Sequence, residues 1–382
     1  MIYSVSQYML SVEHIDVMSH TPLLRSILPL RNEDGSLRCR VGNSVIVFEV
    51  MCNGVHSALR LYMRPHRNLQ AIYGDNYYPK ELLVSSSATQ SDLVDVVLCR
   101  WYEGETLQCK IEQWSEDPTK MAALSSTFET LAISLLREPW AHGDIKPENI
   151  IVDKRDMHLI DYDAMFCPGF TADDCIDIGT SQFQHPLRNE KLFDRSIDDY
   201  PIALIATVLA AMSLDSRLGR KLQTIDYMLI SPSRAVAGRD EMLEYVENLF
   251  AEAGDARHYR IARLLRSPRP SLPQLKSLLE GAEYIVDESS QELISEYINE
   301  SWGYTQGGKV VIPPYYDIAF DFSEGLGLVR IADVWHFIDP MGRVAITCGR
   351  GSGIKPFCNG FTRMKRDDGD VVIYRDGRIE IE

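Results

Sequence analysis

The stretch His142–Asp161 reads HGDIKPENIIVDKRDMHLID, and the rest of the chain is best interpreted from it outward. It contains Asp144, a lysine two residues later, an asparagine five residues later, a short β-rich run and a second aspartate, Asp161. One Asp-x-Lys pair occurs by chance in many loops. The informative feature is that all of these residues occur together, in this order.

The pattern D-x-K-P-x-N, followed by the apolar run Ile150–Val152 and by Leu159–Asp161, resembles the catalytic loop and the metal-binding aspartate of the protein kinase superfamily. The resemblance covers roughly residues 40–280. It implies a bilobal fold with a small β-rich N-lobe and a large helical C-lobe. The fold class expected from it is α+β.

The resemblance implies a role for each polar residue of the loop. Asp144 would accept or orient the proton of the acceptor hydroxyl, and Lys146 would steady the transferring phosphate. Asn149 and Asp161 would hold Mg²⁺, which takes oxygen ligands from one or two carboxylates and from the nucleotide phosphates. Asp163 is a weaker third metal candidate, because this chain has DYD where the family has DFG. ATP and Mg²⁺ are therefore the expected cofactors.

The N-lobe segment that is expected to contact the nucleotide phosphates differs from the kinase pattern. Only Gly42 stands where the family has a glycine-rich loop, and a lone glycine is also typical of a turn. Arg60 replaces the phosphate-binding lysine of a strand, and its planar fork makes the exchange non-conservative. The helix that supplies a pairing glutamate should lie near Arg64–Tyr73, which has no acid, and Glu81 stands at an expected strand start. Gly42 and Arg60 remain the candidate phosphate contacts.

A strand is expected over Leu93–Cys99, and the next residues, Arg100–Leu107, read RWYEGETL. This pattern resembles the kinase hinge, in which backbone groups pair with adenine. Trp101 and Tyr102 are the expected contacts; the alternative is an ordinary turn from a strand to a helix. A helix is expected over Lys120–Arg137, where leucine and phenylalanine recur at helical spacing.

Downstream of the loop, Gly179–Pro186 reads GTSQFQHP and resembles the end of a kinase activation segment. The resemblance places the Thr180 hydroxyl near Asp144 and Lys146. Asp198 resembles the aspartate that bonds the backbone of the catalytic loop, and a plain helix N-cap is the alternative.

Composition narrows the classes of partner and compartment. A formal net charge of −16 argues against nucleic acid, because binding that polyanion needs clustered lysine and arginine. The eight cysteines show no CxxC pair, which favours free thiols and a cytoplasmic location. The N-terminus lacks the pattern of a secretory signal. The longest apolar run, Pro201–Leu214, is shorter than the roughly 20 residues of a membrane span, so it predicts a core helix and no membrane partner.

The C-terminal part of the sequence repeats. Gly-Lys-Val, Gly-Arg-Val and Gly-Arg-Ile begin at residues 308, 342 and 377, and Phe-x-x-Gly begins at residues 322 and 357. A fixed period marks stacked small units, and these resemble WG repeats. The predicted division of the chain is a helical lead-in (1–36), an N-lobe (37–100), a C-lobe (101–281), an acidic helical connector (282–301) and small antiparallel β repeats (302–382).

The sequence therefore predicts an ATP- and Mg²⁺-dependent, kinase-like phosphotransferase of bacterial type acting on Ser/Thr hydroxyls. Its β-repeat tail either binds a protein partner or caps the large lobe. One alternative is a catalytically weak or inactive pseudokinase that works as a signalling scaffold, since Gly42 and Arg60 depart from the pattern. A small-molecule phosphotransferase is a further alternative, against which Lys146 argues.

Overall fold

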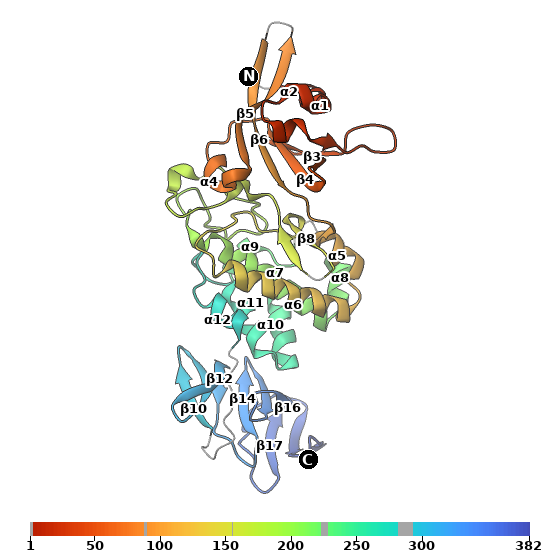
Figure 1. Ribbon diagram of the computed structural model, residues 1–382. Coiled ribbons are helices and arrows are strands. Elements are labelled where there is room, and N and C mark those ends of the chain that lie inside the picture. The colour runs from red at the N-terminus through yellow and green to blue at the C-terminus, as the bar shows by residue number, and fades with distance from the viewer. Residues whose placement is uncertain (1–2, 88–89, 155, 223–227, 282–292) are drawn as a thin grey trace.

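The computed structural model describes residues 3–87, 90–154, 156–222, 228–281 and 293–382. It is a mixed α+β structure with a β-rich N-terminal region, a helical middle region and small antiparallel sheets at the C-terminal end. The three regions follow one another along the long axis of the molecule (Figure 1).

The N-terminal region is built on one antiparallel sheet. Its order is β1-β3-β4-β6-β5, with β2 paired to β3. The strands are β1 (Leu28–Pro29), β2 (Cys39–Val41), β3 (Val45–Cys52), β4 (Val55–Tyr62), β5 (Tyr77–Ser87) and β6 (Gln90–Arg100). Strands β3 and β4 form a hairpin that pairs across the turn at Asn53 and Gly54. Arg60 lies on the central strand β4, between Val47 of β3 and Val97 of β6.

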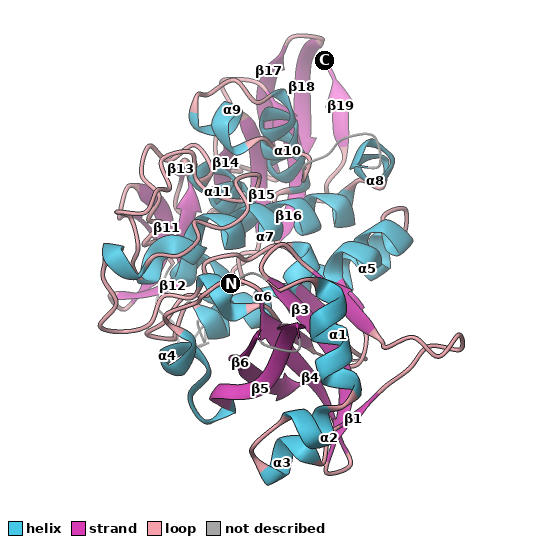
Figure 2. Cartoon of the chain, turned by 90° about the horizontal axis from the view of Figure 1, so that it is seen from above, coloured by secondary structure: helices cyan, strands magenta, loops and turns pink. Residues whose placement is uncertain are grey.

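Three short helices lie against this sheet, α1 (Val5–Glu13), α2 (Ile15–Met18) and α3 (Pro22–Arg25) (Figure 2). Tyr8 and Val12 of α1 share one apolar core with Ile46 and Phe48 of β3. The helical lead-in is thus correct as secondary structure, but it belongs to the sheet region, because β1 within it pairs with β3.

The middle region is packed around one long helix. Fourteen of the residues of α7 (Asp199–Leu214) are buried, which explains why the sequence is apolar on every side. By length and composition, Arg195–Leu214 is the one described helical stretch apolar enough to cross a membrane, but 89% of its apolar window is buried within the protein. The predicted core helix is confirmed.

The other helices surround α7. They are α5 (Leu107–Trp114), α6 (Pro118–Leu135), α8 (Arg217–Leu222), α9 (Pro232–Val236), α10 (Glu241–Ala253), α11 (Ala256–Leu264) and α12 (Leu275–Glu280). A small sheet of β7 (Glu105–Thr106), β8 (Ile150–Val152) and β9 (Met157–Leu159) lies between the middle region and the N-terminal sheet (Figure 1). Because β8 and β9 form a hairpin, they bring the residues before Ile150 next to those after Leu159.

The C-terminal region contains three antiparallel sheets. Their strands are β10 (Ile294–Ile298), β11 (Ser301–Gln306) and β12 (Lys309–Tyr316), then β13 (Ile318–Ala319), β14 (Gly327–Ile331), β15 (Val334–Ile338) and β16 (Val344–Arg350), and last β17 (Phe361–Arg366), β18 (Gly369–Tyr374) and β19 (Ile379–Ile381).

The predicted helical connector is wrong where the structure describes it. Ile294–Ile298 forms β10, which pairs with β11, so the β region begins before residue 302. Ile294 and Tyr297 have the spacing of one helix face, yet they are 56% and 60% exposed on a strand edge. The first part of the predicted connector, residues 282–292, lies outside the described residues.

The β tail packs against the helices, which agrees with one of the two roles that the sequence left open for it. Tyr304 and Val329 belong to the same buried core as α7 and α11. The His336 ring nitrogen Nε2 lies 2.7 Å from the carbonyl oxygen of Ala251 in α10, and Arg260 of α11 donates to Asp317 at 2.8 Å. The tail therefore covers the end of the helical region, whether or not it also binds a partner.

Candidate functional site

One buried carboxylate fixes the backbone of the loop that follows α6. Asp198, the last residue of the 3₁₀ turn before α7, accepts the backbone N–H groups of His142 at 2.5 Å and Gly143 at 2.9 Å. Complete burial raises the pKa of Asp198, and the two N–H donors work against this shift. The predicted backbone contact of Asp198 is confirmed.

The residue directly before Asp144 is a glycine for a steric reason. Its φ is +84°, and a Cβ at this position would lie 2.1 Å from the carbonyl oxygen of Ala164. Only glycine fits such a left-handed conformation at this close approach. The backbone turn at Gly143 directs Asp144 toward the segment that carries Thr180.

The structure brings the four predicted catalytic residues together. The Oδ1 atom of Asp144 accepts the Thr180 backbone N–H at 2.6 Å, and its Oδ2 atom accepts Lys146 Nζ at 2.8 Å and Asn149 Nδ2 at 3.0 Å. Lys146 Nζ also donates to Thr180 Oγ1 at 2.8 Å. Each polar side chain of the group is therefore fixed by another member.

Electrostatics keeps Asp144 ionised. Burial disfavours its charge, but the Lys146 ammonium and the Thr180 donors outweigh burial, so the pKa of Asp144 lies below its usual value. A carboxylate of this kind is an acceptor for a hydroxyl proton at neutral pH.

Asp161 is placed beside this loop by the β8–β9 hairpin. Ile160 donates its N–H to the carbonyl oxygen of Asn149 at 2.9 Å, and the His142 ring nitrogen Nε2 lies 2.9 Å from the Ile160 carbonyl oxygen. Asp161 itself has φ +67° and ψ +63°. A non-glycine residue in this region is strained, and such strain gathers at functional sites.

Arg60 reaches Asp161 from the N-terminal sheet. Its Nη2 atom lies 2.6 Å from Asp161 Oδ1 and 2.7 Å from Asp163 Oδ2. Asp163 is further held by the hydroxyl groups of Tyr62 and Tyr73, both at 2.7 Å from Oδ1. The sequence predicted Arg60 and Asp161 as site residues but missed both tyrosines. Tyr62 had a signal, since it lies two residues after Arg60 on the same face of β4.

Glu81 is not the partner of Arg60. Its Oε1 atom accepts the backbone N–H groups of His20 and Thr21 at 2.7 and 2.5 Å, which fixes the backbone directly before α3. The expected helix near Arg64–Tyr73 is the short α4 (Leu69–Tyr73). Its contribution to the site is the Tyr73 hydroxyl rather than a glutamate.

The expected hinge connects the sheet to the helical region. The Trp101 ring stacks on His56 with centroids 5.3 Å apart, and the Tyr102 ring stacks on His158 at 4.3 Å. Gly104 has φ +135°, and a Cβ there would lie 2.2 Å from the carbonyl oxygen of Val152. The stacked rings and the glycine fix the path of the chain between the two regions.

Gly42 lies in the exposed turn between β2 and β3, where its N–H donates to the Val45 carbonyl oxygen at 2.9 Å. That N–H is already used within the turn. Gly42 therefore has a structural role in this conformation.

The residues present fit a metal ion that is also bound by phosphates. In the described part of the chain, no group of three or more His, Cys, Asp or Glu side chains could hold a metal alone. Asn149 uses its Nδ2 atom on Asp144, which leaves its carbonyl oxygen as a potential ligand. The Asp161 side chain is 41% exposed. Two protein oxygens and phosphates are a typical magnesium set.

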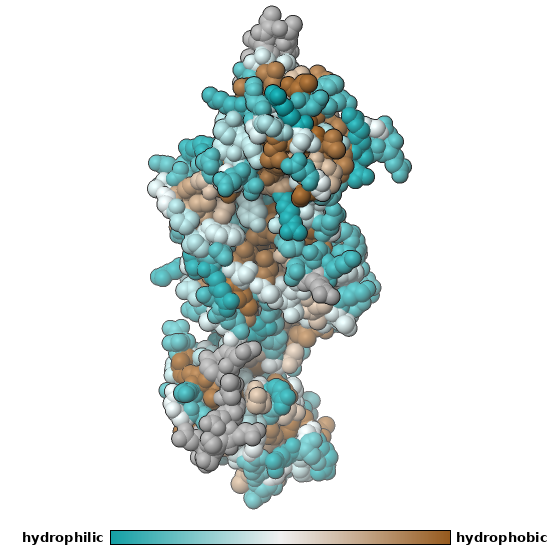
Figure 3. Space-filling model, in the orientation of Figure 1, coloured by the Kyte–Doolittle hydropathy of each residue, from teal (hydrophilic) through white to brown (hydrophobic). Residues whose placement is uncertain are grey.

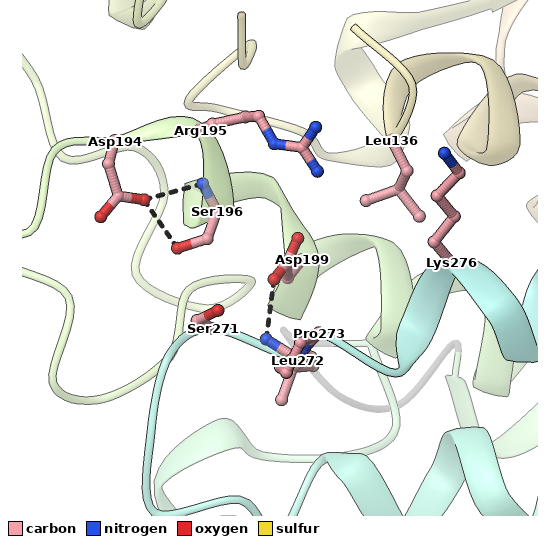
Figure 4. A pocket seen from close by; sticks show the side chains of 9 residues that line it. All are labelled: Leu136, Asp194, Arg195, Ser196, Asp199, Ser271, Leu272, Pro273 and Lys276. Carbon is pink, nitrogen blue, oxygen red and sulfur yellow. Dashed lines mark hydrogen bonds between the residues drawn. The ribbon is translucent and has the colours of Figure 1, made fainter. Parts of the chain in front are cut away.

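A cavity of about 450 Å³ lies at the start of α7 and shares no residue with this site. Its lining includes Arg195, Asp199 and Lys276 (Figure 4). Asp199 accepts the Leu272 N–H at 2.7 Å, and burial raises the pKa of Asp199 to about 6. Asp198 and Asp199 thus connect the start of α7 to two different segments.

Comparison with known proteins bears on the C-terminal region. A family model described as WG containing repeat matches residues 305–335. Comparison with curated proteins finds no match. The matched range runs from the end of β11 into β15, so the predicted WG-type character of the tail is supported there.

Proposed function

We propose that this chain is a protein-kinase-like phosphotransferase that uses ATP and Mg²⁺ and acts on Ser/Thr hydroxyls of a protein. The N-terminal sheet region and the helical region would be its two lobes. The observation that carries the proposal is the group around Asp144, in which Lys146, Asn149 and Thr180 are all fixed on one ionised carboxylate. A purely structural loop has no need for this arrangement of a lysine, an asparagine and a threonine around one carboxylate.

Each residue has a role in this proposal. Asp144 orients the acceptor hydroxyl and takes up its proton, while Lys146, 2.8 Å from Asp144, binds the phosphate that moves. Asn149 and Asp161 would hold the metal, and Arg60 would contact the phosphates. Bound Mg²⁺–ATP would supply the phosphoryl group and neutralise its charge. A cytoplasmic location accords with the eight unpaired cysteines.

The test is transfer of the γ-phosphate from labelled ATP, to the chain itself and to a protein acceptor. We expect Asp144→Asn to lower the rate about a hundredfold to ten-thousandfold, because it removes the base while preserving the shape of the side chain. The melting temperature should stay near that of the wild type. Equal background transfer by both proteins would refute the proposal of catalysis.

The alternative function, a scaffold without turnover, also has a supporting observation. Arg60 lies 2.6 Å from Asp161, so the expected metal ligand is already paired with a cation. A scaffold that binds nucleotide or partners without turnover would tolerate such a pair. Exposed apolar side chains on the N-terminal region, including Leu10, Val17 and Leu28, offer surface for a partner (Figure 3). Nucleotide binding without transfer would favour this function.

A further inference from the structure

The two carboxylates that share Arg60 differ in exposure. The Asp161 side chain is 41% exposed and the Asp163 side chain 24%, whereas the Arg60 side chain is only 8% exposed. A ligand that enters from solvent therefore reaches Asp161 more readily than Asp163. The guanidinium of Arg60 therefore lies between the more accessible Asp161 and the more buried Asp163.

Both carboxylate oxygens of Asp163 are occupied. Oδ1 accepts the hydroxyls of Tyr62 and Tyr73, and Oδ2 accepts Arg60 Nη2. The His66 ring nitrogen Nε2 lies 3.0 Å from the Asp163 carbonyl oxygen. With three donors on its carboxylate and 24% of its side chain exposed, Asp163 is less open to a metal ion than Asp161, which is 41% exposed.

The network also joins elements that are distant in sequence. Arg60 and Tyr62 come from β4, Tyr73 ends α4, and Asp163 belongs to a 3₁₀ turn, Tyr162–Ala164, that follows Asp161. Arg60 Nη2 lies 2.7 Å from Asp163 Oδ2, so this ion pair links the sheet to the helical region.

We infer that Asp163 is the positioning residue for Arg60 and substitutes for the helix glutamate that this chain lacks. Asp163 holds the guanidinium above the site, and Asp161 exchanges Arg60 for the metal-bound nucleotide. The inference rests on the proposed function for its ligand, but the Arg60–Asp163 link itself is a property of the free protein.

This arrangement sets up a competition at Asp161. While Asp163 balances Arg60, the arginine can release Asp161 without losing its only counter-charge. Without the Asp163 charge, Asp161 becomes the sole carboxylate partner of Arg60, and Mg²⁺ must displace a tighter ion pair. The Mg²⁺ concentration needed for nucleotide binding should therefore rise.

The experiment compares Asp163→Asn and Asp163→Glu with the wild type in full-length protein. Calorimetry with a non-hydrolysable ATP analogue, titrated at several Mg²⁺ concentrations, gives the Mg²⁺ concentration at half-saturation. We expect Asp163→Asn to raise it about tenfold or more, since a hydrogen bond to a charged group is lost, and Asp163→Glu to restore part of the effect. The matched control is Asp95→Asn, because Asp95 accepts the Tyr77 hydroxyl at 2.9 Å on the same sheet without contacting Arg60.

A readout without nucleotide separates this inference from the proposed function. The NMR signal of the Arg60 Nε–H group should show an ordered side chain in the wild type and in Asp161→Asn, and a mobile one in Asp163→Asn. Loss of order in Asp161→Asn alone would overturn the inference. An unchanged Mg²⁺ requirement in Asp163→Asn, or the same rise in Asp95→Asn, would also overturn it. Failure of the wild type to bind the analogue would instead refute the proposed function.

Discussion

Asp144 meets its partners within one loop and one following segment, whereas Arg60 meets its partners from a strand, a short helix and a turn that lie far apart in the sequence. The Asp144 group is the lower half of the site, and its loop is also anchored by Asp198, which is fully buried. The upper half consists of Arg60 and the carboxylates of Asp161 and Asp163, which share the Arg60 guanidinium. The difference teaches that the lower half is a preformed unit, while in the proposed function the upper half would have to rearrange for a nucleotide to bind.

The anchor of the lower half gives the largest expected effect of the following variants. Asp198→Ala leaves the buried N–H groups of His142 and Gly143 without acceptors, and each such group costs about 1–3 kcal/mol. We expect the free energy of unfolding to fall by about 2–4 kcal/mol, measured by urea denaturation. Asp198→Asn keeps one acceptor and should lose less. Equal stability of the alanine variant and the wild type would show that the lower half is not anchored in this way.

The neighbouring Asp199 tests the other contact at the start of α7. Burial raises the pKa of Asp199 from 3.8 to about 6, so the folded protein binds this proton more tightly than the unfolded chain. Proton binding by Asp199 therefore stabilises the folded protein fully below pH 3.8, and this stabilisation is lost as the pH rises through about 6.

Asp199→Asn keeps an oxygen for the Leu272 N–H but removes the charge. We expect the variant to lose this pH dependence and to be about 1–3 kcal/mol more stable than the wild type at pH 7. Unfolding measured between pH 4 and 7 provides the test. Asp194→Asn is the comparison variant, because exposed Asp194 lines the same cavity and its charge is the smallest of the causes of the Asp199 pKa shift, so most of the pH dependence should remain (Figure 4). A wild-type profile in Asp199→Asn would contradict the prediction.

Thr180→Val probes the connection within the lower half with a smaller expected effect. The change removes the hydroxyl that accepts Lys146 at 2.8 Å but keeps the backbone N–H on Asp144. We expect phosphate transfer to fall about tenfold, with little change in nucleotide affinity. Thr180→Ser should retain the wild-type rate. A comparable loss in the serine variant would mean that the methyl group matters rather than the hydroxyl.

The same contrast explains what could be predicted from the sequence. Asp144, Lys146 and Asn149 lie within His142–Asp161, so their order allowed them to be identified through the resemblance to a kinase catalytic loop, and the same resemblance pointed to Thr180 and Asp198 downstream. The role of Asp163 could not be identified in this way, because its tyrosine partners lie 101 and 90 residues away along the chain. No local pattern encodes such contacts.

The region around Ile294–Ile298 shows a second limit. Its apolar residues fit helical spacing, but isoleucine and tyrosine also favour strands, and pairing with β11 decided the outcome. For short apolar segments, tertiary contacts override the local period. The β repeats were easier to recognise, because their turns recur in the sequence.

The central claim is that Asp161 exchanges Arg60 for metal-bound nucleotide above a preformed Asp144 group. The most direct measurement is binding of a non-hydrolysable ATP analogue, with and without Mg²⁺, to the wild type and to Asp161→Ala. We predict Mg²⁺-dependent binding by the wild type and loss of the Mg²⁺ dependence in the variant. Absence of Mg²⁺-dependent binding in the wild type, or equal Mg²⁺-dependent binding by the two proteins, would contradict the account.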